Sequence, residues 1–190
     1  SEEDAREPYL TKYREVTGKL GQLFGPHESF GRVLFDKAED MRANKRKEEL
    51  YRDYYTYSGE AYGKAADIRR DLGTTDVDVP LFAGIAYLNA EMFAEAAQYL
   101  NMTVQLDPNL EQAWFYMEFS YYKAGKYDDA IKAALFIDET LGSTDPQVFQ
   151  ILWQCYRDKA TAADNAGDSA GFQENRRLYE DAYITWATYK

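Results

Sequence analysis

Cysteine and histidine are almost absent from this sequence, which contains only Cys155 and His27. One cysteine cannot form an internal disulfide, so cysteine usage leaves the redox compartment open. The two residues cannot build a zinc site, and no Ser–His–Asp arrangement has a plausible spacing. We therefore expect neither an enzyme nor a chain that binds a metal or a cofactor. Cys155 is expected to be buried packing, and His27, beside Pro26, to lie in a surface loop.

Proline and long apolar runs are scarce as well. The 190 residues include five prolines, and helix-forming residues dominate the stretches between them, which indicates helices. No apolar run approaches the roughly 20 residues that a membrane span needs, so we expect no integral membrane segment. The sequence starts at Ser1 rather than Met, which fits a trimmed chain or a removed targeting segment. We expect a soluble chain, either cytoplasmic or exported.

The sequence has fewer basic residues than acidic ones. The formal net charge is −11, and such a surface repels a polyanion, so a nucleic acid partner is not expected. The largest basic run, between Arg42 and Lys47, is followed directly by Glu48 and Glu49. Opposite charges at this spacing are typical of a solvated helix face rather than of a binding patch.

Internal repetition is what the sequence does contain. The segment 77–87 aligns with 111–121 at an offset of 34 residues, and a third copy begins at Pro146 after a further 35. A partial fourth copy lies upstream, because 72–76 matches 141–145 at an offset of 69. A fixed period in this range is the signature of a helical-repeat array.

The repeat resembles the tetratricopeptide repeat. In the copy that starts at Glu111 the matching residues are Trp114, Met117, Tyr121, Gly125, Tyr127 and Ala130. The preceding copy supplies Gly84, Tyr87, Phe93, Ala96, Leu100 and the closing Asp107–Pro108. The resemblance implies an all-α fold, a right-handed α-solenoid of antiparallel helix pairs, and a protein that binds proteins or peptides. Trp114, Met117 and Tyr121 share one helical face, which we expect to pack against the paired helix.

A single helical-repeat domain is predicted for the whole chain. Its parts are an N-terminal extension with leading helices (1–42), a degenerate repeat (43–76), two repeats (77–110 and 111–145) and a divergent capping repeat (146–190). A helix opened by Pro8 is expected to end at Gly25–Pro26. Further breaks are expected near Ala43–Asn44 and near Ser58–Gly59, and the last repeat is expected to form an elongated helix pair, 145–166 and 168–188. Pro80 is expected in the first turn of its helix.

One repeat position departs from the family pattern. Glu118 stands where the family has a small residue, and we expect it to loosen the helix pair. Asp168, between the last two helices, is expected to be a helix cap rather than a metal ligand.

A second apolar stripe runs along the helix that contains Trp114. Phe115, Phe119 and Tyr122 follow helical spacing on a side that the paired helix does not cover. A helix that is apolar on two sides must be covered twice. The sequence therefore predicts that something else covers this stripe.

The family resemblance implies that such stripes line a concave groove that binds a partner. The predicted partner-binding residues are Phe82, Ile85, Asn89, Phe115, Phe119, Tyr122 and Lys123, with Asn89 and Lys123 as polar handles. The expected ligand is a helical or extended apolar segment, which makes the protein a non-catalytic adaptor or scaffold. In the alternative, the groove is filled by the chain's own helix or by another copy, and the protein is a self-associating scaffold.

Overall fold

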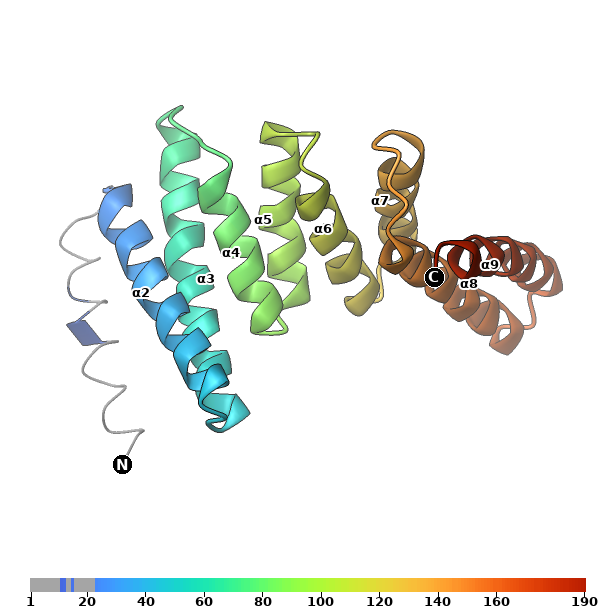
Figure 1. Cartoon of the computed structure of the whole chain (residues 1–190), viewed down its shortest axis with the longest axis horizontal. Helices are drawn as coiled ribbons and strands as arrows, with labels where there is room; N and C mark the ends of the chain where they lie inside the picture. The colour runs from blue at the N-terminus through green and yellow to red at the C-terminus, as the bar shows by residue number, and fades with distance from the viewer. Residues whose placement is uncertain (1–10, 13–14, 16–22) are drawn as a thin grey trace. The chain divides into compact units, whose positions relative to one another are not determined.

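The computed structural model describes residues 11–12, 15 and 23–190, which form helices and turns with no strand among them. The helices bounded within the described residues are α2 (Phe24–Ala43), α3 (Glu48–Asp71), α4 (Asp78–Asn89), α5 (Phe93–Leu106), α6 (Glu111–Lys123), α7 (Tyr127–Glu139), α8 (Pro146–Asn165) and α9 (Ser169–Tyr189). Figure 1 shows them in chain order. The all-α fold class is confirmed for these residues. Most of the helix predicted to open at Pro8 lies outside them.

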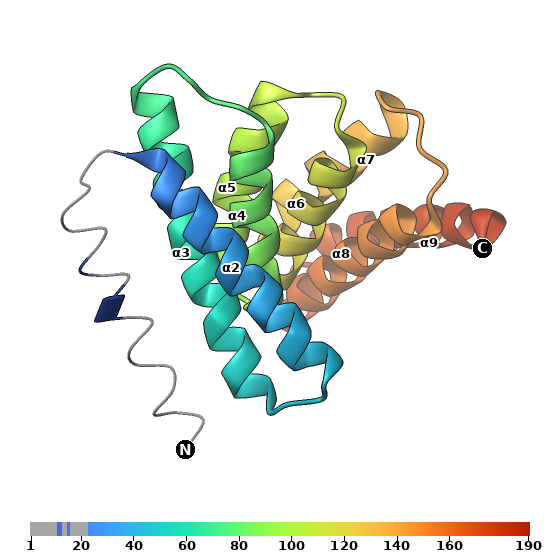
Figure 2. The ribbon, with the colours of Figure 1, turned by 60° about the vertical axis from the view of Figure 1, so that its left-hand side comes forward.

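The chain divides into two compact units. The first comprises Ser1–Met92 and the second Phe93–Lys190. Within the first unit, α3 packs against both α2 and α4, and within the second each helix packs against the next. Neighbouring helices inside each unit run in opposite directions, as Figures 1 and 2 show. The division into repeats stays a prediction, although α5 begins at Phe93 and α7 at Tyr127, 34 residues later.

The predicted break at Ser58–Gly59 is wrong, because α3 runs without interruption through both residues. Gly59 lies under the ring of Tyr87 from α4, and a Cβ atom there would stand 2.9 Å from ring carbons. The Ser58 hydroxyl donates a hydrogen bond of 2.8 Å to the Gly31 carbonyl of α2. Small residues at this point let three helices approach closely rather than end one of them. The break predicted near Ala43–Asn44 is confirmed, since α2 ends at Ala43.

The start of α2 corrects two further expectations. Gly25 and Pro26 lie in the first turn of this helix rather than at a helix end. Proline is tolerated there because a first-turn N–H has no intrahelical acceptor. His27 is buried, with 3% of its surface exposed, and not in a surface loop. Burial, followed by the nearby charge of Lys64, lowers the pKa of His27, so the neutral imidazole is favoured.

The core of the second unit joins α6, α7, α8 and α9. Its buried members are Ala130, Ile131, Ala134, Ile137, Val148, Ile151, Leu152, Cys155 and Ala182. Met117 and Ala130 are buried on the facing sides of α6 and α7, as the repeat pattern predicts. Trp114 is half-buried and stacks on Phe136 of α7 with ring centroids 4.1 Å apart. The helices turn at Gly125, whose φ of 71° favours glycine.

The elongated last helix pair is confirmed, with a capped start to each helix. The Asp145 side chain accepts a hydrogen bond from the Gln147 N–H at 2.8 Å, and the Asp168 side chain accepts one from the Gly171 N–H at 3.0 Å. Pro80 lies in the first turn of α4, as expected. The Asp168 cap and the position of Pro80 could be predicted from the sequence, because a cap and a first-turn proline depend only on a few neighbouring residues.

Replacing Trp114 with phenylalanine is expected to lower the free energy of unfolding by about 0.5–1.5 kcal/mol. The indole Nε1 of Trp114 donates to the Pro108 carbonyl at 2.9 Å, and phenylalanine lacks this donor. Trp153→Phe is the matched control, because the buried Nε1 of Trp153 has no acceptor among the described residues. Urea unfolding followed by circular dichroism compares the two. Equal losses in both variants would show that ring volume, not the hydrogen bond, is responsible.

Candidate functional site

The predicted residues of the first unit lie together on α4. Phe82 has 42% of its surface exposed, and its ring stacks on Tyr62 of α3 with centroids 5.5 Å apart. Asn89 is already engaged, because its Nδ2 donates to the Ile85 carbonyl at 2.9 Å and its Oδ1 accepts from Arg42 of α2 at 3.4 Å. The amide of Asn89 is therefore oriented by the protein itself.

The predicted residues of the second unit lie on α6. Phe115, Phe119 and Tyr122 are half-buried and pack against the core formed by α7 and α8. Phe119 meets Phe93 of α5 edge-on with centroids 6.3 Å apart, and the Lys123 ammonium lies 5.4 Å from the centre of the Phe119 ring. The four residues follow one another along α6, and the neighbouring helices cover part of each of the three aromatic rings.

Helix α8 contributes polar residues that sequence reasoning missed. The Tyr122 hydroxyl donates to Asp158 Oδ2 at 3.4 Å. Asp158 also pairs with Arg157 at 2.7 Å, and the Arg157 guanidinium lies 5.3 Å from the Trp153 ring centre. The repeat alignment could have pointed to them, because the offset of 35 residues puts Arg157 and Asp158 on the repeat positions of Tyr122 and Lys123.

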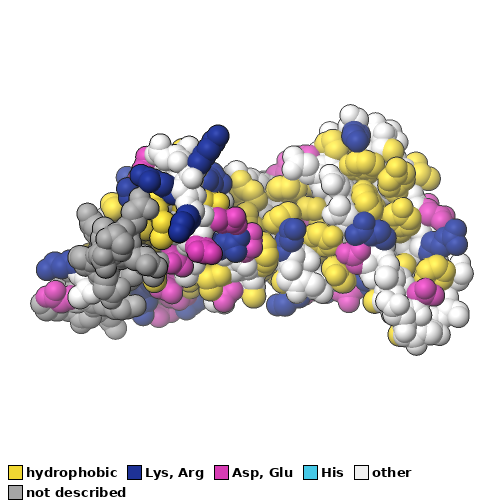
Figure 3. All heavy atoms as spheres, turned by 90° about the horizontal axis from the view of Figure 1, so that it is seen from below, with side chains coloured by type: hydrophobic (Ala, Val, Ile, Leu, Met, Phe, Trp, Pro, Cys, Tyr) yellow, Lys and Arg dark blue, Asp and Glu magenta, His cyan; other side chains and the backbone are white. Residues whose placement is uncertain are grey.

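The same offset places two glutamines of α8 at repeat positions that hold aromatic residues on α6. Gln150 and Gln154 take the repeat positions of Phe115 and Phe119. Gln150 is exposed and Gln154 is half-exposed. We refer to Phe115, Phe119, Tyr122 and Lys123 together with Gln150 and Gln154 as the α6–α8 surface. Figure 3 shows one face of the molecule, on which hydrophobic side chains gather over the second unit.

The interior beneath this surface holds a buried acid. Glu118 has none of its surface exposed, and neither of its carboxyl oxygens has a hydrogen-bond partner among the described residues. Burial, with a smaller effect of Asp145, raises the pKa of this carboxyl well above its usual value. The neutral form is favoured, because a low dielectric disfavours the charged one.

Cys155 lies in the same interior. It is fully buried and belongs to the hydrophobic core, as the sequence predicts. Burial, then Glu118, raises the pKa of this thiol to about 12. Because the thiolate is the nucleophilic form, Cys155 is an inert packing residue.

No group of three or more His, Cys, Asp or Glu side chains among the described residues could hold a metal ion. No helix that the structure describes is both long enough and apolar enough to cross a bilayer.

The chain is similar to solved structures, but the other comparisons with known proteins give no match. No family model matches the sequence, and no curated protein matches it either. The solved structures that are similar over most of the chain include YrrB, described as a TPR protein with an unusual peptide-binding site, and a chain of MamA. The chain resembles tetratricopeptide-repeat proteins.

The likeness concerns the fold. YrrB is 14% identical in sequence, covers 93% of this chain and 96% of its own, and has a TM-score of 0.43. MamA is 15% identical, covers 82% of this chain and 98% of its own, and has the same TM-score of 0.43. Identities this low say nothing about which residues bind a ligand.

Proposed function

We propose that this protein is a non-catalytic interaction adaptor whose second unit binds a helical or extended peptide segment on the α6–α8 surface. The observation that carries the proposal is that Phe115, Phe119 and Tyr122 stay half-exposed after α5, α7 and α8 have packed around α6. Monomeric surfaces rarely keep contiguous aromatic side chains in this state, and aromatic residues are enriched where proteins bind one another.

The charges around the aromatic stripe favour an apolar ligand with few charges. Arg157 and Asp158 neutralise each other at 2.7 Å, and Lys123 is held over the Phe119 ring. Gln150 and Gln154 offer donors and acceptors that suit a peptide backbone. An amphipathic helix or an extended apolar segment fits this combination better than a free carboxylate, which needs several charged donors.

We propose Phe82, Ile85 and Asn89 as a second set of contact residues, on α4 of the first unit. Phe82 is exposed, and the bond from Arg42 holds the Asn89 amide in a fixed orientation. A fixed amide loses little conformational entropy when a ligand binds it.

Truncating Phe119 to alanine is expected to weaken peptide binding by about tenfold to a hundredfold, because burial of an aromatic ring contributes about 1.5–3 kcal/mol. The probe is a peptide enriched on the purified protein from a random display library, and its Kd is measured by fluorescence anisotropy. Leu135→Ala on α7 is the matched control, since Leu135 is half-buried against the same core but lies outside the α6–α8 surface.

Three outcomes would contradict the proposal. They are failure to enrich any peptide, equal binding by wild type and Phe119→Ala, and equal weakening in Phe119→Ala and Leu135→Ala. Light scattering at two protein concentrations tests the rival function. A dimer that Phe119→Ala dissociates would assign the α6–α8 surface to a second copy of the chain.

A further inference from the structure

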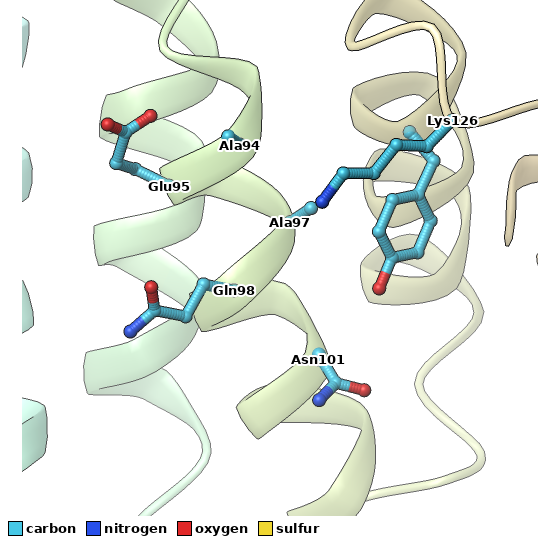
Figure 4. Close-up of a pocket in the computed structure, with 7 residues that line it drawn as sticks. Ala94, Glu95, Ala97, Gln98, Asn101 and Lys126 are labelled. Carbon is cyan, nitrogen blue, oxygen red and sulfur yellow. The ribbon is translucent and has the colours of Figure 1, made fainter.

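A cavity of about 390 Å³ opens between α5 and the turn that joins α6 to α7. Figure 4 shows it in close-up. Ala94, Ala97 and Asn101 lie three or four residues apart and so share one face of α5. The two alanines leave the space that larger side chains would fill. From the other side Lys126, in the turn, extends its side chain toward Ala97. The volume falls within the range of roughly 300–1,000 Å³ that is typical of ligand pockets.

Lys126 differs from the other lysines of the second unit. Lys132 pairs with Asp129 at 3.1 Å, and Lys159 pairs with Asp128. Lys123 and Lys190 lie over aromatic rings, at 5.4 and 4.8 Å from the ring centres. Lys126 has neither kind of partner within the described part of the chain. Its ammonium group is therefore available to a ligand that enters the cavity.

The cavity is also lined by polar side chains that carry no charge. Gln98 and Asn101 on α5 and Tyr121 on α6 line the cavity. The side chains of these three residues form no hydrogen bond with another described residue. Burial, followed by the charge of Asp129, raises the pKa of Tyr121, so its hydroxyl stays a donor at neutral pH.

The cavity also has a negative end. Glu95 lines it, and in Figure 4 its carboxylate points away from Lys126. A ligand with a negative group near Lys126 and a positive or N–H-rich group near Glu95 would meet opposite charges at both ends. A purely anionic ligand such as free phosphate would meet repulsion at the Glu95 end.

We propose that this cavity is a second peptide-binding site, which takes an extended segment with a carboxylate on Lys126 and a basic group toward Glu95. Gln98 and Asn101 pair with the peptide backbone between the two charges, since an amide donates and accepts at once. The carboxylate comes from an acidic side chain or from a chain end. The proposal is independent of the α6–α8 surface, because Tyr121 and Lys126 are not part of it.

The test uses NMR titration of the full chain, labelled with nitrogen-15, with three short synthetic peptides. The first is blocked at both ends and carries one glutamate and one lysine. The second replaces the glutamate with glutamine. The third also has glutamine but ends in a free carboxylate. We expect the first or the third to shift the amide signals of Ala94, Ala97, Asn101 and Lys126. The peptide that does so identifies the carboxylate as a side chain or a chain end.

Lys126→Ala is expected to weaken this binding by about tenfold or more, since a charge-assisted hydrogen bond is lost. Lys132→Ala is the matched control, because Lys132 is exposed on α7 and already paired with Asp129. High salt should weaken the binding to the wild type.

Several results would overturn the proposal. They are equal binding of the glutamine peptide with blocked ends, equal weakening in the two lysine variants, and no shift at millimolar peptide. Shifts confined to Phe115, Phe119 and Tyr122 would also overturn it, while leaving the α6–α8 surface intact as a binding site.

Discussion

Replacing Glu118 with methionine is expected to raise the free energy of unfolding at pH 7 by about 1–3 kcal/mol. The carboxyl group of Glu118 is fully buried, and neither oxygen has a hydrogen-bond partner among the described residues. Transfer of an unpaired polar group from water into an apolar interior is unfavourable. Methionine has a similar length and a flexible, apolar side chain, so it fills the same space without this penalty.

The gain from Glu118→Met is expected to depend on pH. The pKa of Glu118 in the folded chain lies well above its usual value of 4.5. Below that usual value the carboxyl is protonated in both the folded and the unfolded chain, and pH has no effect through this group. Above it the unfolded chain releases the proton while the folded chain keeps it, so wild-type stability falls as pH rises toward the folded pKa. The advantage of methionine should therefore be smallest in acid and largest at alkaline pH.

Urea unfolding of wild type and variant at pH 4.5, 7 and 8.5 measures this dependence. Glu139→Met is the control, because it makes the same substitution at an exposed position of α7 in the same unit. A loss of stability in Glu118→Met, or a difference that does not change with pH, would contradict the expectation.

Replacing Gly59 with alanine is expected to lower the free energy of unfolding by about 1–3 kcal/mol. In an open helix position the same change would stabilise the protein by about 0.5–1 kcal/mol, because alanine is the better helix former. At Gly59 the added methyl group would stand 2.9 Å from ring carbons of Tyr87. Tyr87 is 7% exposed and cannot swing out without losing its own packing. The expected sign is therefore opposite to that of helix propensity.

Gly25→Ala is the matched control, because no described residue beyond its own helix turn has an atom within 4 Å of the Cβ position at Gly25. This variant should lose less stability than Gly59→Ala, because its added methyl group meets no aromatic ring. Combining Gly59→Ala with Tyr87→Ala completes a double-mutant cycle, in which the two losses should not add. Additive losses would mean that the Tyr87 ring is not what Gly59 accommodates.

The sequence by itself determined the helical architecture from residue 77 onward. Pro80 lies in the first turn of α4 as predicted, and the predicted segments 145–166 and 168–188 match α8 and α9 to within a few residues, with Asp168 as the predicted cap. These signals act between neighbours in the chain, because a cap, a turn or an apolar stripe is complete within one or two helices. The burial of Cys155 was also predicted from the sequence.

Only the tertiary structure decided how particular residues are used. Gly59 looked like a helix break, yet it makes room for Tyr87, which is 28 positions away in the chain. His27 looked exposed beside its proline, yet it is buried in the first turn of α2. Asp158 became a partner of Tyr122 only when α8 packed against α6. Each outcome depends on a contact between distant segments, and such contacts form by packing that local residue patterns do not encode.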